Sequence, residues 1–186
     1  VGIRKGDSVA IIGSGPGGII HAMLAKLSGA ANILVADLVD YRLTMAGRFG
    51  ADVTVNPQKE NLVEKIRSVT DGRGADVVIV TVPNVKAVED SLQTVRRGGR
   101  ILLFAPSQPD QYARLSPHRL FFSEITVVPS YSVSHVETRT ALQLITSGRI
   151  NVKELITHRF PLNRIQEAFQ TAARSKECLK VVVLNE

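Results

Sequence analysis

Three glycines near the start of the chain have a spacing suited to binding phosphates. Gly13, Gly15 and Gly18 follow the apolar run Ser8 to Ile12 in the pattern G-x-G-x-x-G, with Pro16 among them. The first glycine permits a sharp turn from strand to helix, the second lets a pyrophosphate approach the backbone, and the third lets the helix lie close to the sheet. Unpaired N–H groups and the dipole at the helix start stabilise a diphosphate, and proline fits that first turn. The pattern predicts a dinucleotide-binding turn.

A carboxylate follows at the distance such a turn requires. Asp37 ends the second apolar run, 19 positions after Gly18. It would accept hydrogen bonds from the 2′- and 3′-hydroxyls of an adenosine ribose, although a loop aspartate that caps the next helix is the structural alternative. Its charge would repel a 2′-phosphate, which favours NAD over NADP. Arg42, one helical turn further, weakens this preference. Its side chain could clamp the ribose edge or simply be solvated.

The elements that must position these residues are indicated by apolar runs that alternate with helical patterns. Successive apolar residues, as in Val77 to Val80, are typical of parallel strands covered on both faces. One helical stripe is formed by Val85, Val88, Leu92 and Val95 and is expected to end at Gly98-Gly99. We expect an α/β fold: a doubly wound, parallel, six-stranded Rossmann sheet in the order 3-2-1-4-5-6. The predicted strands are residues 8–13, 32–37, 52–55, 76–81, 100–105 and 124–129.

The rhythm of the sequence changes near Ser132. A helix is expected over residues 136–147, another helix carries Ile165 and Phe169, and a last strand covers residues 179–184. The short strands of this region do not extend the first sheet. We therefore expect an NAD-binding domain at residues 1–132 and a C-terminal α/β tail at 133–186 that belongs to a second domain.

Composition narrows the class of protein. Of 186 residues, 44% are hydrophobic, yet no apolar run approaches the roughly 18 residues that span a membrane. Cys178 is the only cysteine, so no intrachain disulfide or cysteine-based zinc site is expected within this chain. A cytoplasmic location is expected. The net charge of +6 is scattered, which favours attraction of an anionic dinucleotide over nucleic-acid binding. The histidines lack metal-ligand spacing; they are His21, His118, His135 and His158.

Several short motifs run through the chain. They are Lys5-Gly6-Asp7, Gly13-Ser14-Gly15-Pro16-Gly17-Gly18, Ala36-Asp37, Phe49-Gly50-Ala51-Asp52, Gly72-Arg73-Gly74-Ala75-Asp76-Val77-Val78, Gly98-Gly99-Arg100 and Ile156-Thr157-His158-Arg159-Phe160-Pro161-Leu162. Together these motifs resemble a known family, the medium-chain zinc-dependent alcohol dehydrogenases, in the branch of sorbitol (iditol) and threonine dehydrogenases. The resemblance covers nearly the whole chain and implies a cofactor domain plus a catalytic domain that is built from a long N-terminal part and the C-terminal tail.

The resemblance implies hydride transfer between NAD and a secondary alcohol, such as a polyol or a threonine-like substrate. The family's catalytic zinc ligands would lie before Val1, so no catalytic or metal residue is assigned here. Zinc is expected only in the full-length protein, and the isolated chain is expected to bind NAD without it. In relatives the strand at residues 124–128 pairs with its copy in a second subunit, which implies a homo-oligomer.

The resemblance also assigns cofactor-binding positions. Gly13, Gly15, Pro16, Gly17 and Gly18 would line the pyrophosphate, Asp37 and Arg42 the adenosine ribose, and Thr81 and Val82 the adenosine side and the crevice. Phe104, Ala105, Ser130 and Tyr131 would face the nicotinamide, largely through backbone groups, and Lys180 matches a basic position near the diphosphate. Ala105-Pro106 departs from the glycines of many relatives, so the nicotinamide side could be shaped differently.

Two other functions remain open from the residues alone. An S-adenosylmethionine-dependent methyltransferase also uses a glycine-rich first turn and an acidic residue after strand 2. A non-catalytic, NAD-sensing module would use the same fold without a catalytic partner. Competition between NAD and S-adenosylmethionine separates the first of these from a dehydrogenase.

Overall fold

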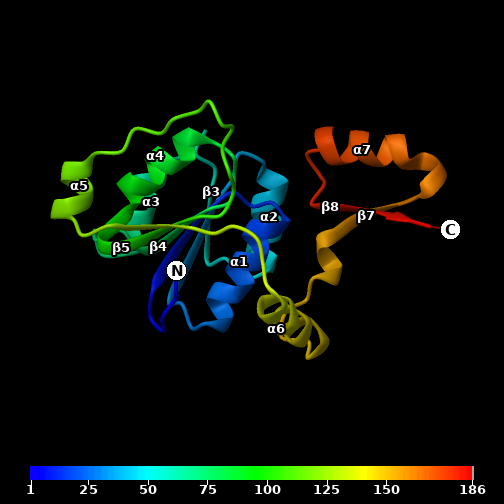
Figure 1. The fold of residues 1–186 in the computed structure, drawn as a ribbon, viewed down its shortest axis with the longest axis horizontal. Coiled ribbons are helices and arrows are strands. Elements are labelled where there is room, and N and C mark those ends of the chain that lie inside the picture. Colours follow the sequence, from blue (N-terminus) through cyan, green and yellow to red (C-terminus); the bar gives the residue numbers. More distant parts are fainter. Residues whose placement is uncertain (186) are drawn as a thin grey trace. The chain divides into compact units, whose positions relative to one another are not determined.

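The computed structural model describes residues 1–185, which form two compact units that divide after Ser132. The first, here called the sheet unit, contains a six-stranded parallel sheet with helices on both faces (Figure 1). Its elements are β1 (Ser8–Ile12), α1 (Pro16–Leu27), β2 (Asn32–Ala36), α2 (Asp40–Arg48), β3 (Val53–Val55), α3 (Leu62–Ser68), β4 (Ala75–Val80), α4 (Val85–Thr94), β5 (Val95–Leu103), α5 (Pro117–Phe122) and β6 (Thr126–Pro129).

The strand order is β3-β2-β1-β4-β5-β6, which confirms the order expected from the sequence. Ile12, the last residue of β1, pairs with Ala36 of β2 on one side and Val80 of β4 on the other. The carboxyl ends of these three strands are therefore level. Because the chain winds in opposite directions from β1, this edge is the switch point at which ligands bind in open α/β sheets.

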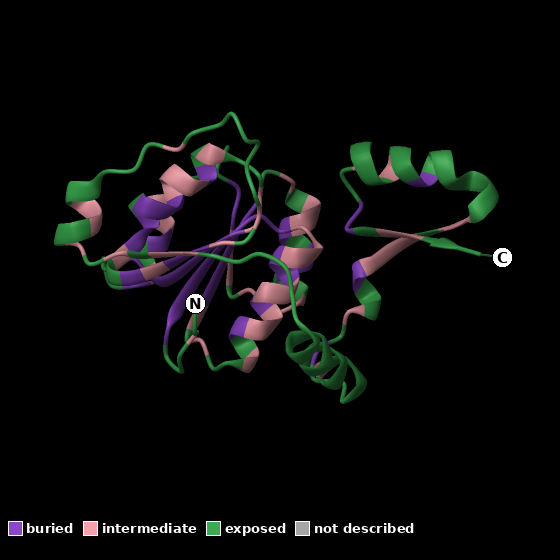
Figure 2. Cartoon of the chain, viewed as in Figure 1, coloured by how far each residue is buried: buried purple, intermediate pink, exposed green. Residues whose placement is uncertain are grey.

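The core is formed by the central strands. Every residue of β1 and β4 is buried, as Figure 2 shows in purple along the sheet. Residues such as Ile11 and Ile79 are at most 1% exposed, because α1 and α2 cover one face and α3 and α4 the other (Figure 1). Burial of each such side chain contributes about 2 kcal/mol. This packing explains the unbroken apolar runs and makes the edge of the sheet a rigid base for a binding site.

The prediction for β5 was wrong at its start. The helical stripe was expected to include Val95 and to end at Gly98-Gly99, but α4 ends at Thr94 and Val95 already pairs with Ala75 of β4. The register then shifts, so that the next pair is Val77 with Arg100. The glycines serve this irregularity, since Gly98 has φ +66° and a Cβ at Gly99 would lie 2.5 Å from a methyl of Val95. The other strands agree with the predicted ranges within two residues at either end, whereas α5 was not predicted.

The second unit, here called the tail unit, comprises residues 133–185. Strands β7 and β8 pair in parallel as a separate two-stranded sheet, and α7 contacts both of them. Its elements are α6 (His135–Thr146), the short 3₁₀ helix η1 (Lys153–Leu155), β7 (Ile156–Pro161), η2 (Leu162–Arg164), α7 (Ile165–Arg174) and β8 (Lys180–Leu184). In the described part of the chain, no helix has both the length and the apolar character that crossing a membrane demands.

Candidate functional site

The turn between β1 and α1 is built as the glycine spacing predicts. Gly13 has φ +106°, and a Cβ there would lie 2.5 Å from both Thr81 Oγ1 and Val82 Cγ1. A Cβ at Gly18 would lie 1.9 Å from the carbonyl oxygen of Gly13, which is far inside any tolerable contact. These two glycines are therefore required by the close approach of α1 to the sheet.

Gly15 is different, because its side-chain direction is open. A Cβ at Gly15 would meet no atom within 4 Å. Gly15 is the N-cap of α1, no side chain caps this helix, its first turn holds no acidic residue, and Pro16 follows directly. The positive end of the helix therefore faces space that an anion can enter.

Thr81 joins the end of β4 to this turn. Its hydroxyl lies 3.0 Å from the carbonyl oxygens of both Ile12 and Gly13 and donates its single proton to this pair. The backbone N–H of Thr81 also donates to Ile12, at 2.9 Å. Thr81 thus fixes the position of the turn, while its neighbour Val82 lines the pocket described below.

Asp37 connects the turn to the loop after β2. Its Oδ2 accepts a hydrogen bond of 2.7 Å from the N–H of Ser14, and its Oδ1 accepts one of 2.9 Å from the N–H of Val39. Ser14 is fully buried, and its hydroxyl donates to the backbone oxygen of Arg42 at 2.8 Å. Each carboxylate oxygen has two lone pairs, so each can accept one further hydrogen bond. Asp37 therefore has two roles: it caps the loop after β2 through Val39, and it lines the pocket described below.

A pocket of about 550 Å³ lies beside the turn, a volume in the usual range for small-molecule sites. Its walls come from the loops after β1, β2, β3 and β4. The apolar lining includes Val39, Leu62, Val82, Pro83 and Ala87, and the charged lining consists of Asp37, Arg42, Lys86 and Asp90. A pocket with a largely apolar wall and the carboxylate of Asp37 in its lining suits an adenosine.

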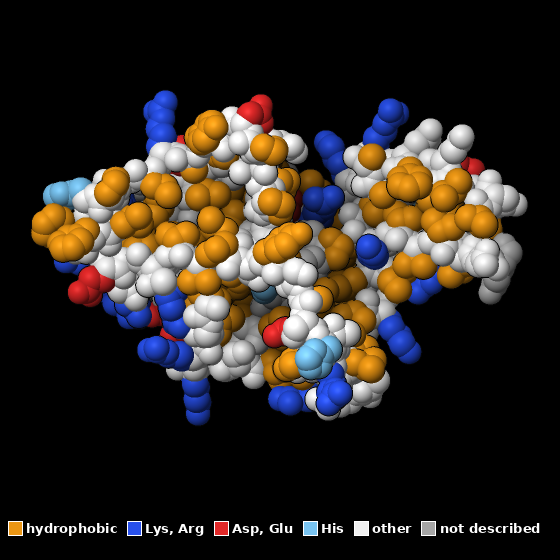
Figure 3. Space-filling view, viewed as in Figure 1, with side chains coloured by type: hydrophobic (Ala, Val, Ile, Leu, Met, Phe, Trp, Pro, Cys, Tyr) orange, Lys and Arg blue, Asp and Glu red, His pale blue; other side chains and the backbone are white. Residues whose placement is uncertain are grey.

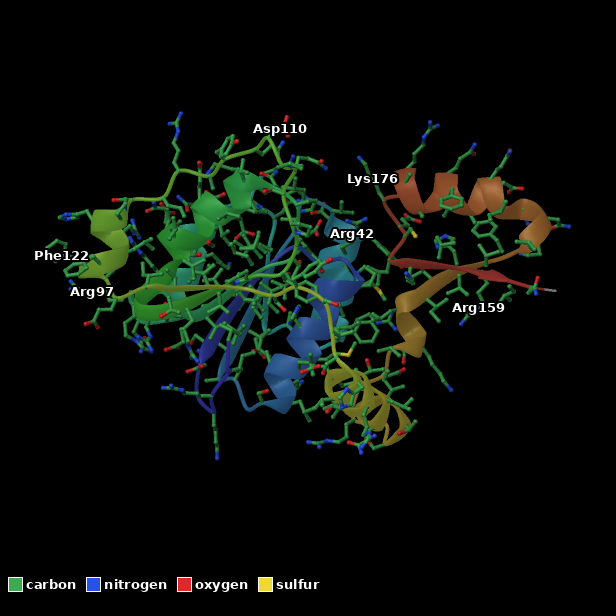
Figure 4. All side chains as sticks on the ribbon, viewed as in Figure 1. Arg42, Arg97, Asp110, Phe122, Arg159 and Lys176 are labelled. Atoms are coloured by element: carbon green, nitrogen blue, oxygen red, sulfur yellow. The ribbon has the colours of Figure 1, made fainter. Side chains whose placement is uncertain are left out.

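Arg42 places a guanidinium group in the wall of the pocket. It extends from α2 and lines the pocket (Figure 4). Its Nε is buried and, among the described residues, has no hydrogen-bond partner. A buried donor without a partner is costly, and the guanidinium group that carries this donor belongs to a residue of the pocket wall. The residues present therefore fit an adenosine diphosphate group.

Past the turn, the predicted nicotinamide-side residues come from the ends of β5 and β6. The N–H groups of Phe104 and Ala105 both donate to the carbonyl oxygen of Val80, at 3.0 and 3.3 Å. The N–H of Ser130 donates to Leu103 at 3.0 Å, and Tyr131 is almost fully exposed. Lys180 is an exposed residue at the start of β8 and belongs to the tail unit.

His21 lies on α1 and packs edge-on against Phe104, with ring centroids 4.5 Å apart. Burial lowers the pKa of His21 from 6.5 to about 4, so the side chain is neutral at physiological pH. Among residues 1–185, no group of three or more His, Cys, Asp or Glu side chains is arranged to hold a metal ion.

Sequence reasoning missed most of the pocket lining. It identified Gly13, Asp37, Arg42 and Val82 but not Val39, Leu62 or the start of α4. The available signal was general: all these residues lie just beyond the carboxyl ends of the predicted strands, where ligands bind in this fold.

Comparison with known proteins places the chain in a family. A family model described as zinc-binding dehydrogenase matches residues 16–147. The chain is 32% identical over 183 residues to sorbitol dehydrogenase of Bacillus subtilis, an alignment that covers 97% of this chain and 51% of the relative. It is 33% identical over 185 residues to L-threonine 3-dehydrogenase of Bacillus licheniformis, and that alignment covers 98% of this chain and 53% of the relative.

Solved structures of dehydrogenases superpose closely on this chain. Alcohol dehydrogenase TADH from Thermus sp. ATN1 superposes with a TM-score of 0.92 at 30% identity, over 99% of this chain and 52% of that one. A zinc-binding dehydrogenase from Sinorhizobium meliloti, solved bound to NADP, superposes with a TM-score of 0.91 at 28% identity. This superposition covers 98% of this chain and 54% of that one. The chain thus spans about half the length of the curated relatives it matches. It belongs to the zinc-binding dehydrogenases, the medium-chain alcohol dehydrogenase family whose motifs it carries.

Proposed function

We propose that the sheet unit is the cofactor domain of an NAD-dependent dehydrogenase that moves hydride between NAD and a secondary alcohol of the polyol or threonine-like class. The observation that carries the proposal is the open turn at Gly15 joined, through Ser14, to the carboxylate of Asp37 at the edge of a 550 Å³ pocket. Relatives named sorbitol, L-threonine 3- and D-arabitol-phosphate dehydrogenase support the substrate class.

In this proposal the pyrophosphate lies over the first turn of α1, along Gly13, Gly15, Pro16, Gly17 and Gly18. The adenosine enters the pocket, where the two remaining lone pairs of Asp37 accept the ribose hydroxyls and the side chain of Arg42 lies beside the ribose. Thr81 holds the turn and Val82 forms a wall. When bound, the nicotinamide would accept or release the hydride.

The residues around the ribose favour NAD over NADP. A 2′-phosphate would come close to the carboxylate of Asp37, and like charges at short range disfavour binding. Arg42 acts in the opposite direction, because its guanidinium could pair with that phosphate. We propose that Asp37 dominates, since its oxygens are held in place by Ser14 and Val39.

No residue of this chain is proposed as a zinc ligand. We assign the zinc, and the Lewis-acid chemistry it supplies, to the part of the relatives that this chain does not span. The tail unit would complete that catalytic domain, which would account for the exposed Phe169 of α7. The isolated chain is then expected to bind NAD without turnover. We propose that Lys180, Ser130 and Tyr131 contact the cofactor only in the full-length protein.

We also propose a cytoplasmic homo-oligomer. The strand β6 is an edge of the sheet, and unpaired edges are usually covered. Next to it, α5 exposes the rings of Phe121 and Phe122, at the end of the sheet unit where hydrophobic side chains gather in Figure 3 and where Figure 4 labels Phe122. These observations support pairing through the predicted segment 124–128. Sedimentation of the chain at increasing concentration tests it, and a strictly monomeric sample would contradict it.

The proposed cofactor role is tested by titrating the folded chain with NADH and following nicotinamide fluorescence. We expect saturable binding that NAD and ADP-ribose displace and S-adenosylmethionine does not. A folded sample without any response up to millimolar NADH, or one in which S-adenosylmethionine competes, would overturn the proposal.

A further inference from the structure

The side chain of Asn56 joins two loops that border the adenosine pocket. Asn56 follows β3 directly and is only 5% exposed. Its Nδ2 donates to the carbonyl oxygen of Leu38 at 3.2 Å and to Asp40 Oδ1 at 2.8 Å. Its Oδ1 accepts a hydrogen bond of 3.1 Å from the N–H of Gln58, in its own loop. The orientation of the amide is therefore fixed, because the two partners of Nδ2 accept and the partner of Oδ1 donates.

Asp40 receives a second tie from the same loop. Its Oδ2 pairs with the ammonium of Lys59 at 2.6 Å, and the hydrogen bonds from Lys59 and Asn56 hold the pKa of the Asp40 carboxyl below its usual range. The side chains of Lys59 and Asp40 are each 62% exposed, so their ion pair contributes little by itself. The buried amide of Asn56 is therefore the stronger link between the loop after β2 and the loop after β3.

The loop that Asn56 holds carries the carboxylate assigned to the ribose. Asp37 immediately precedes Leu38, and its own N–H donates to the carbonyl oxygen of Val55 at 3.1 Å. Asp37, Leu38 and Asp40 are thus each tied to the end of β3 or to Asn56. Asp37 and Leu38 line the pocket, whereas Asn56 does not. Any effect of Asn56 on a ligand must pass through the residues that it holds.

We infer that Asn56 is a positioning residue for the cofactor: it holds the loop at residues 37–40 so that the carboxylate of Asp37 meets the adenosine ribose, and it thereby supports the preference for NAD over NADP. The inference rests on the proposed function and deepens it, because it names a residue that acts through Asp37. A carboxylate that is already in place when the ligand arrives avoids the cost of ordering it on binding. The net worth of a hydrogen bond of this kind corresponds to roughly a 3- to 10-fold change in affinity.

Dissociation constants for NADH and NADPH, measured by calorimetry on the full chain, test the inference. Asn56→Ala removes the side-chain hydrogen bonds to Leu38, Asp40 and Gln58 without a change of charge. We expect it to weaken NADH by roughly 3- to 10-fold and NADPH by less, so that the preference for NADH falls. Asn56→Ser should lie between the wild type and Asn56→Ala, because a hydroxyl has one proton and can serve Leu38 or Asp40 but not both. If Asn56→Ala does not fold, Asn56→Ser carries the comparison.

A second comparison shows whether Asn56 acts through Asp37. In the Asp37→Ala background, Asn56→Ala should weaken NADH by less than about 2-fold, because the carboxylate that Asn56 positions is then absent. The control is Thr70→Ala, which removes a side chain that is 3% exposed and lies before β4. The Thr70 hydroxyl donates to the carbonyl oxygen of Ile66 at 2.7 Å and accepts from the N–H of Gly74 at 3.0 Å. Thr70→Ala should lower the melting temperature and leave both dissociation constants unchanged.

Three results would each overturn the inference. They are equal weakening of NADH and NADPH by the folded Asn56 variants, an undiminished effect of Asn56→Ala in the Asp37→Ala background, and wild-type affinities in the Asn56 variants. A wild type that binds neither NADH nor NADPH refutes the proposed function instead, so the two failures are distinguishable.

Discussion

Protonation of His21 should make the fold sensitive to acid. The pKa of His21 is lowered to about 4 because the ring is buried against Phe104, while the same residue in the unfolded chain titrates near 6.5. Above pH 6.5 both states are neutral at this position, and its contribution to stability is fully present. As the pH falls from 6.5 toward 4, the unfolded state binds the proton first, so the native state loses relative stability.

The magnitude follows from the two pKa values. Each pKa unit corresponds to about 1.4 kcal/mol. The difference between 6.5 and about 4 therefore limits the loss to about 3 kcal/mol, of which about 2 kcal/mol is lost by pH 5. Against a typical stability of about 5–15 kcal/mol, this is a large fraction. Below pH 4 the loss stops, because both states are then protonated.

The assay compares the wild type with His21→Leu, which fills the site without a titratable group. Urea unfolding at pH 7, 6, 5 and 4 gives the free energy of unfolding of each, and the other histidines and the carboxylates contribute equally to both. The difference between the two proteins should change by about 3 kcal/mol across this range. Parallel pH profiles, or an NMR titration of His21 with a midpoint near 6.5, would refute the reasoning.

Four substitutions test the site and its support. Asp37→Ala removes the acceptor of the ribose hydroxyls and should weaken NAD by roughly 10-fold or more while reducing discrimination against NADP; calorimetry with both cofactors checks it, and an unchanged preference removes Asp37 from this role. Gly15→Ala, whose Cβ enters open space, should preserve the melting temperature but weaken NADH. Gly18→Ala should instead destabilise the fold by more than about 2 kcal/mol, because its Cβ meets the Gly13 carbonyl, so equal melting temperatures for the two glycine variants would contradict the geometry. Asp76→Ala removes the acceptor of the Ser8 N–H and the partner of Arg96 at the opposite ends of the strands, and should cost about 1–3 kcal/mol in urea unfolding with no change in NADH affinity.

The amino-acid sequence alone determined the fold class, the order of the sheet and the turn that begins α1. Continuous apolar runs, such as the one in β4, are a local signal of strands buried on both faces, and the structure has them in the predicted order. Gly13 was identifiable because its positive φ belongs to the turn itself, and Gly18 because its closest contact, the carbonyl oxygen of Gly13, lies within the same turn. Asp37 was identifiable because the length of one βαβ unit sets its distance from those glycines.

Only the tertiary structure decided how the site is assembled. The start of β5 was mispredicted because Asp76, twenty positions away in sequence, pairs with Arg96 and holds the chain in an irregular strand where local pattern suggested a helix. The pocket, the buried Nε of Arg42 and the contact between Gly17 and Phe104 likewise join segments far apart in the chain. Periodicity and spacing describe neighbours along the chain, whereas these contacts depend on which strand ends the sheet brings level, and only folding brings those ends together.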